Sequence, residues 1–327
     1  MSIGGNILVT GGAGFIGSHL VDALMKNRDI EEVRVIDNFS TGRIENISNH
    51  LKSKKFSLLR DDIRNRKAVH KAMKNIDYVF HEAAIASVSL SVKNPQACYE
   101  VNVNGTLSLL EEARIQDATF IYASSCAVYG DPSKIPIRED DVPKPISPYG
   151  ASKLSAEALC IAYNKTYGLR STCLRYFNVY GPRQLYNKYS GVITIFTNQA
   201  LRGEDITIYG DGKQTRDFIH VKDVVDANLL IANCKRAYGL VFNVGTGKET
   251  SIKSLALKII KIVGADVKIV YKDPIKGDIR RSVADISRIN KIANYSPKIS
   301  LDEGLSSFVK HVLSHKLKGS AGAGKGG

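Results

Sequence analysis

The residues best able to do chemistry in this sequence are a tyrosine and a lysine four positions apart. Tyr149 and Lys153 lie in the segment SPYGASKLSAEAL. If that segment is helical, the two side chains share one face with their Cβ atoms about 5–6 Å apart. A free tyrosine titrates at about 10, but a cation or an oxidised nicotinamide beside it stabilises the phenolate and lowers its pKa. The pair indicates a proton-transfer site, although a surface tyrosine beside a lysine would have the same spacing.

A second group of polar side chains lies at 122–130, in the segment YASSCAVYG. Ser124 and Ser125 come where an apolar run ends, and either hydroxyl could hold a substrate oxygen. Cys126 and Ala127 follow directly. Alanine has no proton to transfer, and a thiol with an ordinary pKa of about 8.5 is a poor replacement for a carboxylic acid. The segment therefore favours chemistry at a hydroxyl without a further acid and base.

A glycine-rich turn near the start of the chain indicates a dinucleotide site. Gly11, Gly14 and Gly17 stand between an apolar run and a helical pattern, an arrangement that lets a pyrophosphate approach the first turn of the helix. Asp37 follows Gly17 by 20 positions and could accept the ribose hydroxyls of the adenosine, which favours NAD over NADP. The alternatives are that the glycines form only a turn, that Asp37 only ends a strand, or that nearby Arg43 admits NADP.

The elements that must position these groups alternate between short β-branched runs and longer helical patterns. Such alternation predicts an α/β fold, a doubly wound Rossmann-type parallel sheet with helices on both faces and right-handed crossovers. The expected strands are Asn6–Thr10, Val33–Asp37, Phe56–Arg60, Tyr78–His81, Phe120–Ser124 and Ser171–Arg175.

The character of the sequence changes after Arg175, where loops rich in glycine, proline and asparagine separate shorter elements. The run Val241–Gly247 is typical of a strand that returns to the main sheet, so the lobes are expected to be interleaved. The expected division is an NAD-binding Rossmann domain over 1–177, to which 216–247 returns, a smaller C-terminal substrate-binding lobe over 178–215 and 248–315, and a flexible tail over 316–327.

Composition narrows the class of protein. The chain has 327 residues and a net charge of +14, with lysine and arginine spread along it rather than gathered in one arm. No apolar run is long enough to span a bilayer, and no signal segment is recognisable. We expect a cytoplasmic protein that binds neither membranes nor nucleic acid. The cysteines lack C-x-x-C spacing, which favours reduced thiols and no metal site: Cys98, Cys126, Cys160, Cys173 and Cys234.

Ordered motifs along nearly the whole chain, to about Leu313, resemble the extended short-chain dehydrogenase/reductase family, in its branch of nucleotide-sugar epimerases and dehydratases. The matching pieces are TGGAGFIG, VIDNFSTG, DDIRN, HEAA, NVNGT, SSCAVYG, YGASK, LRYFNVYGPRQ, IYGDGKQTRDFIHVKDV and GDIRRSVAD. So many motifs in order make coincidence a poor explanation.

The resemblance implies roles for individual residues. The implied catalytic residues are Ser125, Tyr149 as acid and base, and Lys153 as the group that modulates its pKa. The implied NAD contacts are Gly11, Gly14, Phe15, Ile16, Asp37, Asn38, Ser40, Thr41, Gly42, Asp62, Ile63, Ala83, Ala84, Asn102, Tyr149, Lys153 and Tyr176. The implied substrate contacts are Ser87, Val88, Ser125, Asn178, Val192, Ile208, Tyr209, Arg216, Arg280 and Ser282, with Asn178, Arg216 and Arg280 on the diphosphate. Ile275 stands where relatives often carry a phosphate-binding arginine.

The same resemblance implies an activity. Relatives that dehydrate or decarboxylate the sugar carry acidic residues after the hydroxyl, where this chain has Cys126 and Ala127. The expectation is an NAD-dependent 4-epimerase of a UDP-hexose, with the small Ser282 leaving room for an N-acetylated sugar. Alternatives are a UDP-glucuronate epimerase or decarboxylase and a non-catalytic NAD-binding sensor. The helical segments Val101–Arg114 and Ala151–Tyr167 would pair in a homodimer, or could simply cover the sheet.

Overall fold

The computed structural model describes residues 3–186, 190–275 and 277–322. Its centre is a parallel sheet in the order β11-β6-β5-β4-β1-β2-β3. The strands of this sheet are β1 (Gly5–Thr10), β2 (Ile30–Asp37), β3 (Phe56–Arg60), β4 (Tyr78–His81), β5 (Thr119–Ser125), β6 (Ser171–Tyr176) and β11 (Val241–Val244). The Rossmann-type fold class is confirmed. The strand order reverses between β1 and β4, which is where such sheets bind ligands beyond the carboxyl ends of their strands.

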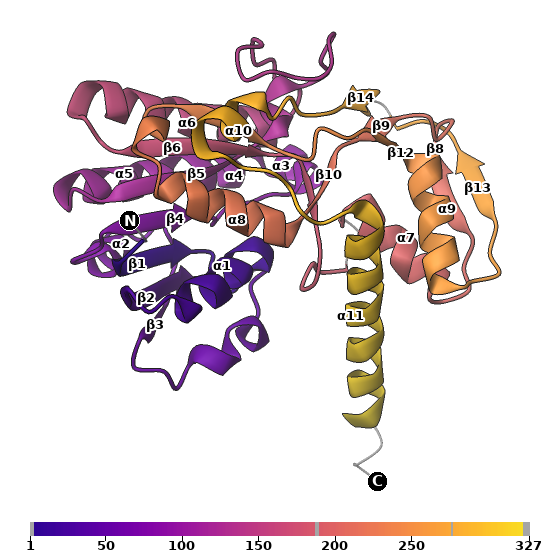
Figure 1. Ribbon diagram of the computed structural model, residues 1–327, viewed down its shortest axis with the longest axis horizontal. Coiled ribbons are helices and arrows are strands. Elements are labelled where there is room, and N and C mark those ends of the chain that lie inside the picture. Colours follow the sequence, from indigo (N-terminus) through magenta and orange to yellow (C-terminus); the bar gives the residue numbers. More distant parts are fainter. Residues whose placement is uncertain (1–2, 187–189, 276, 323–327) are drawn as a thin grey trace.

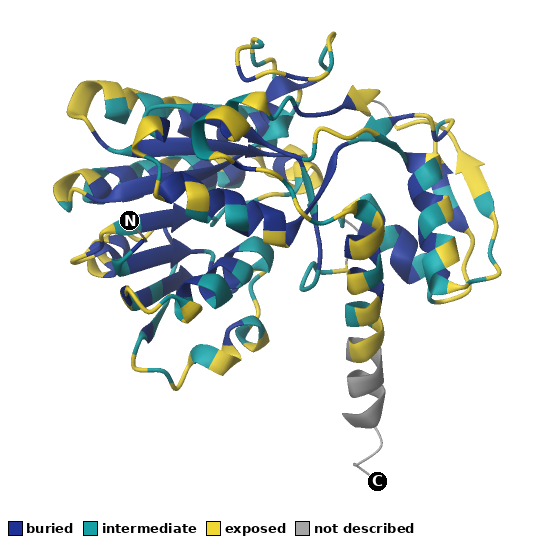
Figure 2. Ribbon diagram, viewed as in Figure 1, coloured by how far each residue is buried: buried dark blue, intermediate teal, exposed yellow. Residues whose placement is uncertain are grey.

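Helices cover both faces of the sheet because the strands are apolar on both sides (Figures 1 and 2). In β1, Ile7 and Val9 pack into one core and Leu8 into the other, as the alternation of a strand requires. One face carries α1 (Phe15–Lys26), α8 (Val221–Ala232) and α10 (Ser287–Ala293). The other carries α2 (Arg66–Met73), α5 (Thr106–Ile115) and α6 (Pro148–Tyr167).

Shorter helical segments connect these elements. They are α3 (Val88–Lys93), α4 (Pro95–Tyr99), the π-helix η3 (Glu100–Gly105) and the 3₁₀ segments η1 (Ile44–Asn46), η2 (Ser48–His50), η4 (Cys126–Tyr129) and η5 (Lys235–Ala237). Helices α5 and α6 both pack on the sheet within one chain. Whether they also pair with a second copy stays a prediction.

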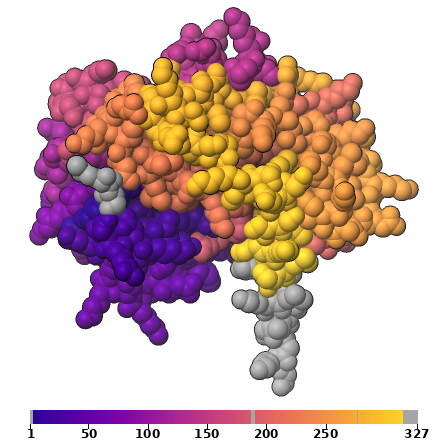
Figure 3. All heavy atoms as spheres, viewed as in Figure 1, coloured from indigo at the N-terminus to yellow at the C-terminus, as the bar shows by residue number. Residues whose placement is uncertain are grey.

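A second lobe has its own core, formed by α7 (Val192–Ala200), β8 (Ile206–Tyr209), α9 (Ile252–Val263), β13 (Ile269–Lys272) and α11 (Leu301–Gly322). Small sheets link it to the first: β7 (Asn178–Tyr180) pairs with β10 (Phe218–His220), and β9 (Thr215–Arg216) lies between β12 (Thr250–Ser251) and β14 (Arg281–Ser282). In the space-filling view, the indigo N-terminal residues and the orange and yellow C-terminal residues form adjoining masses (Figure 3).

Helix α11 continues to Gly322, and residues 323–327 lie outside the described residues. The flexible tail expected over 316–327 stays a prediction.

No helix among the described residues is long and apolar enough to cross a membrane. The same residues contain no cluster of three or more histidine, cysteine or acidic side chains that could hold a metal ion. Each cysteine is a free thiol in the structure.

Candidate functional site

The glycine-rich turn joins β1 to α1 and has the shape of a phosphate cradle. Gly11 has a φ of +66°, and a Cβ there would stand 2.8 Å from the backbone nitrogen of Ala83. At Gly17 a Cβ would lie 2.3 Å from the carbonyl oxygen of Gly11, so only glycine lets the helix approach the strand. Gly14 begins α1 without a side-chain cap, and a Cβ there would meet only the carbonyl of Gly11, at 3.0 Å. The backbone of this turn is therefore accessible to a pyrophosphate.

Asp37 ends β2 beside this turn, with 7% of its surface exposed. Its two carboxylate oxygens accept hydrogen bonds from the backbone N–H groups of Ala13 (2.9 Å) and Phe39 (2.8 Å). Burial raises the pKa of the carboxyl, and those two hydrogen bonds oppose the rise. A Cβ at Gly42 would lie 2.8 Å from Asp37 Oδ1, so a larger residue at this position would crowd the carboxylate. A carboxylate held in this way can accept ribose hydroxyls.

The next polar residues of the expected cofactor set form a network of their own. Asn38 donates from Nδ2 to Asp62 (2.7 Å) and accepts from the backbone N–H of Ser40 (2.9 Å). Hydrogen bonding and ion pairing with Arg64 lower the pKa of Asp62 to about 2. Ile63 is buried beside them. Thr41 makes no contact with the described residues that would assign it a role.

Two further members of the set lie around β4. The N–H of Ala83 donates to the hydroxyl of Thr10 (3.1 Å), which fixes the loop that continues through Ala84. Asn102 accepts from the N–H of Ile85 (2.8 Å) and donates to its carbonyl (3.1 Å). Asn102 also donates to the hydroxyl of Ser152 (2.9 Å). The side chain of Asn102 therefore holds the loop after β4 in place.

The predicted proton-transfer pair lies in the first turns of α6. Ser147 caps this helix by accepting from the N–H of Gly150, and the backbone N–H of Tyr149 donates to the hydroxyl of Ser91 on α3 (3.0 Å). Lys153 is 4% exposed, and its Nζ donates to the carbonyl oxygen of Ala123 (2.8 Å). The structure thus places the Tyr149–Lys153 pair of α6 against the carboxyl end of β5.

The two serines, which the sequence left as alternatives, have different surroundings. Ser124 is buried and donates to the carboxylate of Glu157, 2.7 Å away. Ser125 points the other way, as its place in the strand requires, and lies close enough to Tyr149 for its hydroxyl to lower the pKa of that phenol. Ser125 also accepts from the N–H of Ala127 (3.2 Å). Only Ser125 therefore joins the tyrosine.

Burial dominates the ionisation of the pair. It raises the pKa of Tyr149 to about 12, although the Ser125 hydroxyl lowers it somewhat, so the phenol is protonated at neutral pH in the protein without ligands. It lowers the pKa of Lys153 to about 8, against the opposing charge of Glu82. Most of the ammonium remains charged at neutral pH. A further positive charge near the phenol is needed before Tyr149 can act as a base there.

Cys126 and Ala127 give this site no additional acid or base. Burial raises the pKa of the Cys126 thiol to about 12. Such a thiol stays protonated at neutral pH and is a weak acid. Ala127 contributes a backbone N–H to Ser125.

The expected substrate residues come mainly from the short strands between the lobes. Arg216 of β9 forms an ion pair with Asp278 (2.5 Å), and Arg280 forms one with Asp211 (2.8 Å). Asn178 at the start of β7 donates to the carbonyl of Asp217 (3.1 Å). Each guanidinium group is therefore paired with a carboxylate that an anionic ligand could replace.

The apolar and small members of the substrate set have mixed surroundings. Ser282 of β14 is 5% exposed and lies beside Arg216 in the strand register. Tyr209 is 44% exposed, whereas the adjacent Ile208 is 1% exposed inside the second lobe, so its side chain packs in the core. Ser87 caps α3 by accepting from the N–H of Leu90 (3.2 Å). Val88 is exposed and Val192 half-buried, each in the first turn of its helix.

One ionisable side chain at this end of the sheet was not assigned from the sequence. Glu82 follows β4 and accepts a hydrogen bond from the phenol of Tyr176, 2.7 Å away. Its signal in the sequence was a single acidic residue in the apolar run YVFHEAA. Burial raises the pKa of its carboxyl to about 7.

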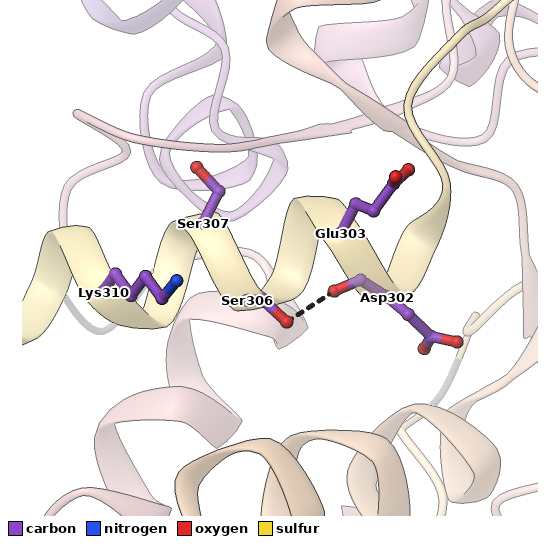
Figure 4. A pocket seen from close by; sticks show the side chains of 5 residues that line it. All are labelled: Asp302, Glu303, Ser306, Ser307 and Lys310. Carbon is purple, nitrogen blue, oxygen red and sulfur yellow. Dashed lines mark hydrogen bonds between the residues drawn. The ribbon is translucent and has the colours of Figure 1, made fainter.

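A hollow on α11 has no part in this arrangement. It has a volume of about 570 Å³ and is lined by Asp302, Glu303, Ser306, Ser307 and Lys310, which all project from one helix (Figure 4). None of the expected cofactor or substrate residues lines it.

Comparison with known proteins gives a consistent match. Residues 7–245 match the family model described as NAD dependent epimerase/dehydratase family. A relative from Methanocaldococcus jannaschii, named putative UDP-glucose 4-epimerase, is 40% identical over 93% of this chain and 97% of its own. Proteins named for UDP-glucuronate also match, at 36% identity.

Solved structures agree along nearly the whole chain. The UDP-glucose 4-epimerase of Thermotoga maritima, solved with UDP-glucose, has a TM-score of 0.90 and 41% identity, over 95% of this chain and 99% of that one. The UDP-N-acetylglucosamine 4-epimerase of Methanobrevibacter ruminantium, solved with UDP-N-acetylmuramic acid, has a TM-score of 0.91 and 40% identity, over 96% of this chain and all of that one.

Proposed function

The chain belongs to the NAD dependent epimerase/dehydratase family, and from that premise we propose that it is a 4-epimerase of a UDP-hexose. The cofactor is NAD. The residues present fit it: the open turn at Gly14, the uncapped start of α1 and the carboxylate of Asp37 suit a pyrophosphate and an adenosine ribose. When bound, NAD supplies reversible hydride transfer at a sugar carbon.

The side chains of α6 and β5 provide the proton chemistry. Tyr149 Oη takes the proton of the 4-hydroxyl and later returns it, while Ser125 Oγ holds the same oxygen. Lys153 Nζ contributes the positive charge that stabilises the phenolate. Because the 4-keto sugar stays attached to UDP, it can turn and present its other face. The hydride removed from carbon 4 would then return to that face from the cofactor, while Tyr149 returns the proton to the oxygen. Arg216 and Arg280 would exchange their aspartates for the diphosphate.

The observation that carries this proposal is that neither of the two residues directly after Ser125 in the chain is a carboxylic acid. Dehydration needs a base for the carbon-5 proton and an acid for the departing hydroxyl. The neighbouring positions hold a thiol whose pKa burial raises to about 12 and an alanine. Reversible oxidation and reduction at carbon 4 is the chemistry that the remaining groups support.

The test is to incubate the purified protein with UDP-glucose, UDP-N-acetylglucosamine and UDP-glucuronate in separate reactions. We expect interconversion at carbon 4 of the first two sugars, without carbon dioxide or stoichiometric NADH. Turnover of UDP-glucuronate alone would favour the glucuronate epimerase, and carbon dioxide the decarboxylase. Bound NAD with no turnover of any sugar would favour the non-catalytic NAD-binding sensor. A sensor needs no proton-transfer group, so the presence of Tyr149 with Ser125 counts against that alternative.

Replacing Asp37 by asparagine should weaken NAD binding by roughly 10- to 100-fold, because a hydrogen bond to a charged group contributes about 1.5–3 kcal/mol. The amide also has one acceptor where the backbone offers two donors, at Ala13 and Phe39. Titration calorimetry with NAD measures the change. The matched control is Asp61→Asn, at a neighbouring carboxylate outside the expected cofactor set. Unchanged affinity in Asp37→Asn would contradict the proposed ribose contact.

Replacing Ser282 by tyrosine should lower turnover of UDP-N-acetylglucosamine roughly tenfold more than that of UDP-glucose. Ser282 is small, nearly buried and adjacent to Arg216 in register, so a larger ring would fill space close to the diphosphate clamp. The ratio of kcat/KM for the two sugars is the measurement, with Ser282→Ala as the control that keeps the space. Equal losses for both sugars would rule out selection by the size of this residue.

A further inference from the structure

Asp217 is a buried carboxylate to which neither the cofactor set nor the substrate set assigns a role. It stands between β9 and β10, and 0% of its surface is exposed. One carboxylate oxygen, Oδ1, accepts hydrogen bonds from the backbone N–H (2.8 Å) and the hydroxyl (2.6 Å) of Thr246. The other, Oδ2, accepts from the N–H groups of Gly247 (2.9 Å) and Ala284 (3.2 Å). The side chain of Asp217 therefore joins the turn after β11 to the chain after β14.

Gly245 leaves the space that this carboxylate occupies. A Cβ at Gly245 would stand 2.7 Å from Asp217 Oδ2 and 2.7 Å from the Cβ of Ala284, which is closer than non-bonded atoms pack. A larger residue at this position would force the carboxylate away from its donors. The close approach at Gly245 and the hydrogen bonds are separate observations, and both indicate that the fold is built around this one carboxylate.

The residues joined to Asp217 include members of the expected substrate set on three strands. The carbonyl oxygen of Asp217 accepts from the backbone N–H (3.0 Å) and from Nδ2 (3.1 Å) of Asn178, the first residue of β7. Arg216 of β9 precedes Asp217 directly in the chain. Ser282 of β14 pairs with Arg216 in register and lies two residues before Ala284, which donates to the carboxylate. The places of all three residues therefore depend on Asp217.

The same hydrogen bonds connect the substrate strands to the sheet that carries the proton-transfer pair. Thr246 and Gly247 follow β11, the edge strand of the main sheet, and β5 with Ser125 is two strands away in that sheet. A UDP-hexose held by its diphosphate at Arg216 must present carbon 4 to Tyr149. Since a small misplacement of a substrate costs much of its productive binding, the link between β9 and β11 decides where the sugar lies.

We propose that Asp217 is a positioning residue for the substrate: its buried carboxylate fixes the strands that carry Asn178, Arg216 and Ser282 to the turn after β11. The inference rests on the proposed function, because it takes the ligand to be a nucleoside diphosphate sugar. It deepens that function by naming the residue that sets the geometry of the diphosphate site. Because both carboxylate oxygens are occupied by donors of the chain, Asp217 acts through these strands and does not itself bind the ligand.

Asp217→Asn keeps the size of the side chain but has only one oxygen for its donors. Whichever way the amide is turned, its NH₂ group faces either the donors of Thr246 or those of Gly247 and Ala284. We expect the Kd for UDP to rise roughly 10- to 100-fold, the effect of losing one hydrogen bond to a charged group. Thr246→Val removes one donor and should raise it roughly three- to tenfold, whereas Thr246→Ser keeps the hydroxyl and should restore the affinity.

The direct test is calorimetric titration of the NAD-loaded protein with UDP. The matched control is Asp223→Asn on α8, because Asp223 is 1% exposed and accepts from the N–H groups of Lys298 (2.9 Å) and Ile299 (3.2 Å). It should leave the Kd for UDP unchanged. Loss of folded protein lowers the number of binding sites but not the Kd of those that remain. An unchanged Kd in Asp217→Asn overturns the proposal; if that variant does not fold, Thr246→Val against Thr246→Ser decides.

Steady-state kinetics separate this inference from the proposed function. In 4-epimerisation of UDP-glucose, Asp217→Asn should raise KM roughly as much as the Kd for UDP and change kcat by less than about threefold. A fall in kcat with KM unchanged would mean a loss of folded protein and would contradict positioning. If the intact protein binds UDP but turns over no UDP-sugar, the proposed function fails, and the UDP titration still decides the role of Asp217. If turnover occurs and neither KM nor the Kd changes in the variant, the role of Asp217 fails alone. An intact protein that binds no UDP would overturn both.

Discussion

Tyr149→Phe should remove nearly all turnover, a loss of roughly 10²–10⁴-fold in kcat, while NAD stays bound. Phenylalanine keeps the ring and the backbone N–H that donates to Ser91, so the start of α6 is preserved. It removes the one atom that can exchange a proton with the 4-hydroxyl next to Ser125. Neither Cys126, whose pKa burial raises to about 12, nor Ala127 can take over that task.

The measurement is a single-turnover assay with UDP-glucose, together with the NAD content of the purified variant. The matched control is Tyr295→Phe, because the Tyr295 hydroxyl is buried without a partner among the described residues and lies outside the proposed site. It should turn over UDP-glucose as the unchanged protein does. Full activity in Tyr149→Phe with NAD bound would defeat the mechanism.

The pH dependence of the unchanged protein should follow from the same groups. Lys153 has a pKa lowered to about 8, so its ammonium is present below that value and is lost as the pH rises through it. Activity that depends on this charge therefore declines on the alkaline side.

The strands were predictable because each is a local pattern. Phe56–Arg60 and Tyr78–His81 have the bounds expected. Strand β2 starts at Ile30, earlier than expected; the prediction missed this start because the polar pair Glu31 and Glu32 interrupts the apolar run. The Tyr149–Lys153 pair also depends only on helical spacing. Periodicity within one segment is sufficient for such features.

Contacts between distant segments were not predictable in this way. Glu82, Tyr176 and Asn228 meet only because β4, β6 and α8 adjoin in the folded sheet. The burial of Ile208 in a separate core, and the aspartates on Arg216 and Arg280, likewise depend on packing between elements. Motifs could name positions in the site, but the partners that set the charge of each group follow from the fold.

Glu157→Ala should lower the free energy of unfolding by about 3–5 kcal/mol, because it leaves a buried guanidinium without its carboxylate. Glu157 and Arg175 have side-chain exposures of 2% and 4%, and their closest atoms are 2.5 Å apart. Glu157 also accepts from Ser124, while Arg175 donates to Tyr129 (2.7 Å). The pair thus ties α6 to β5 and β6 directly beneath Ser125.

Urea unfolding of the NAD-free protein measures the loss. The exposed pair of Lys258 and Asp302 is the matched control, and Lys258→Ala should cost about 0–1 kcal/mol. The double variant Glu157→Leu with Arg175→Leu should be less destabilised than Glu157→Ala, because it removes both charges together. If Glu157→Ala costs no more than the exposed control, the pair does not support the end of β5. The placement of Ser125 against Tyr149 must then depend on the apolar packing of α6 alone.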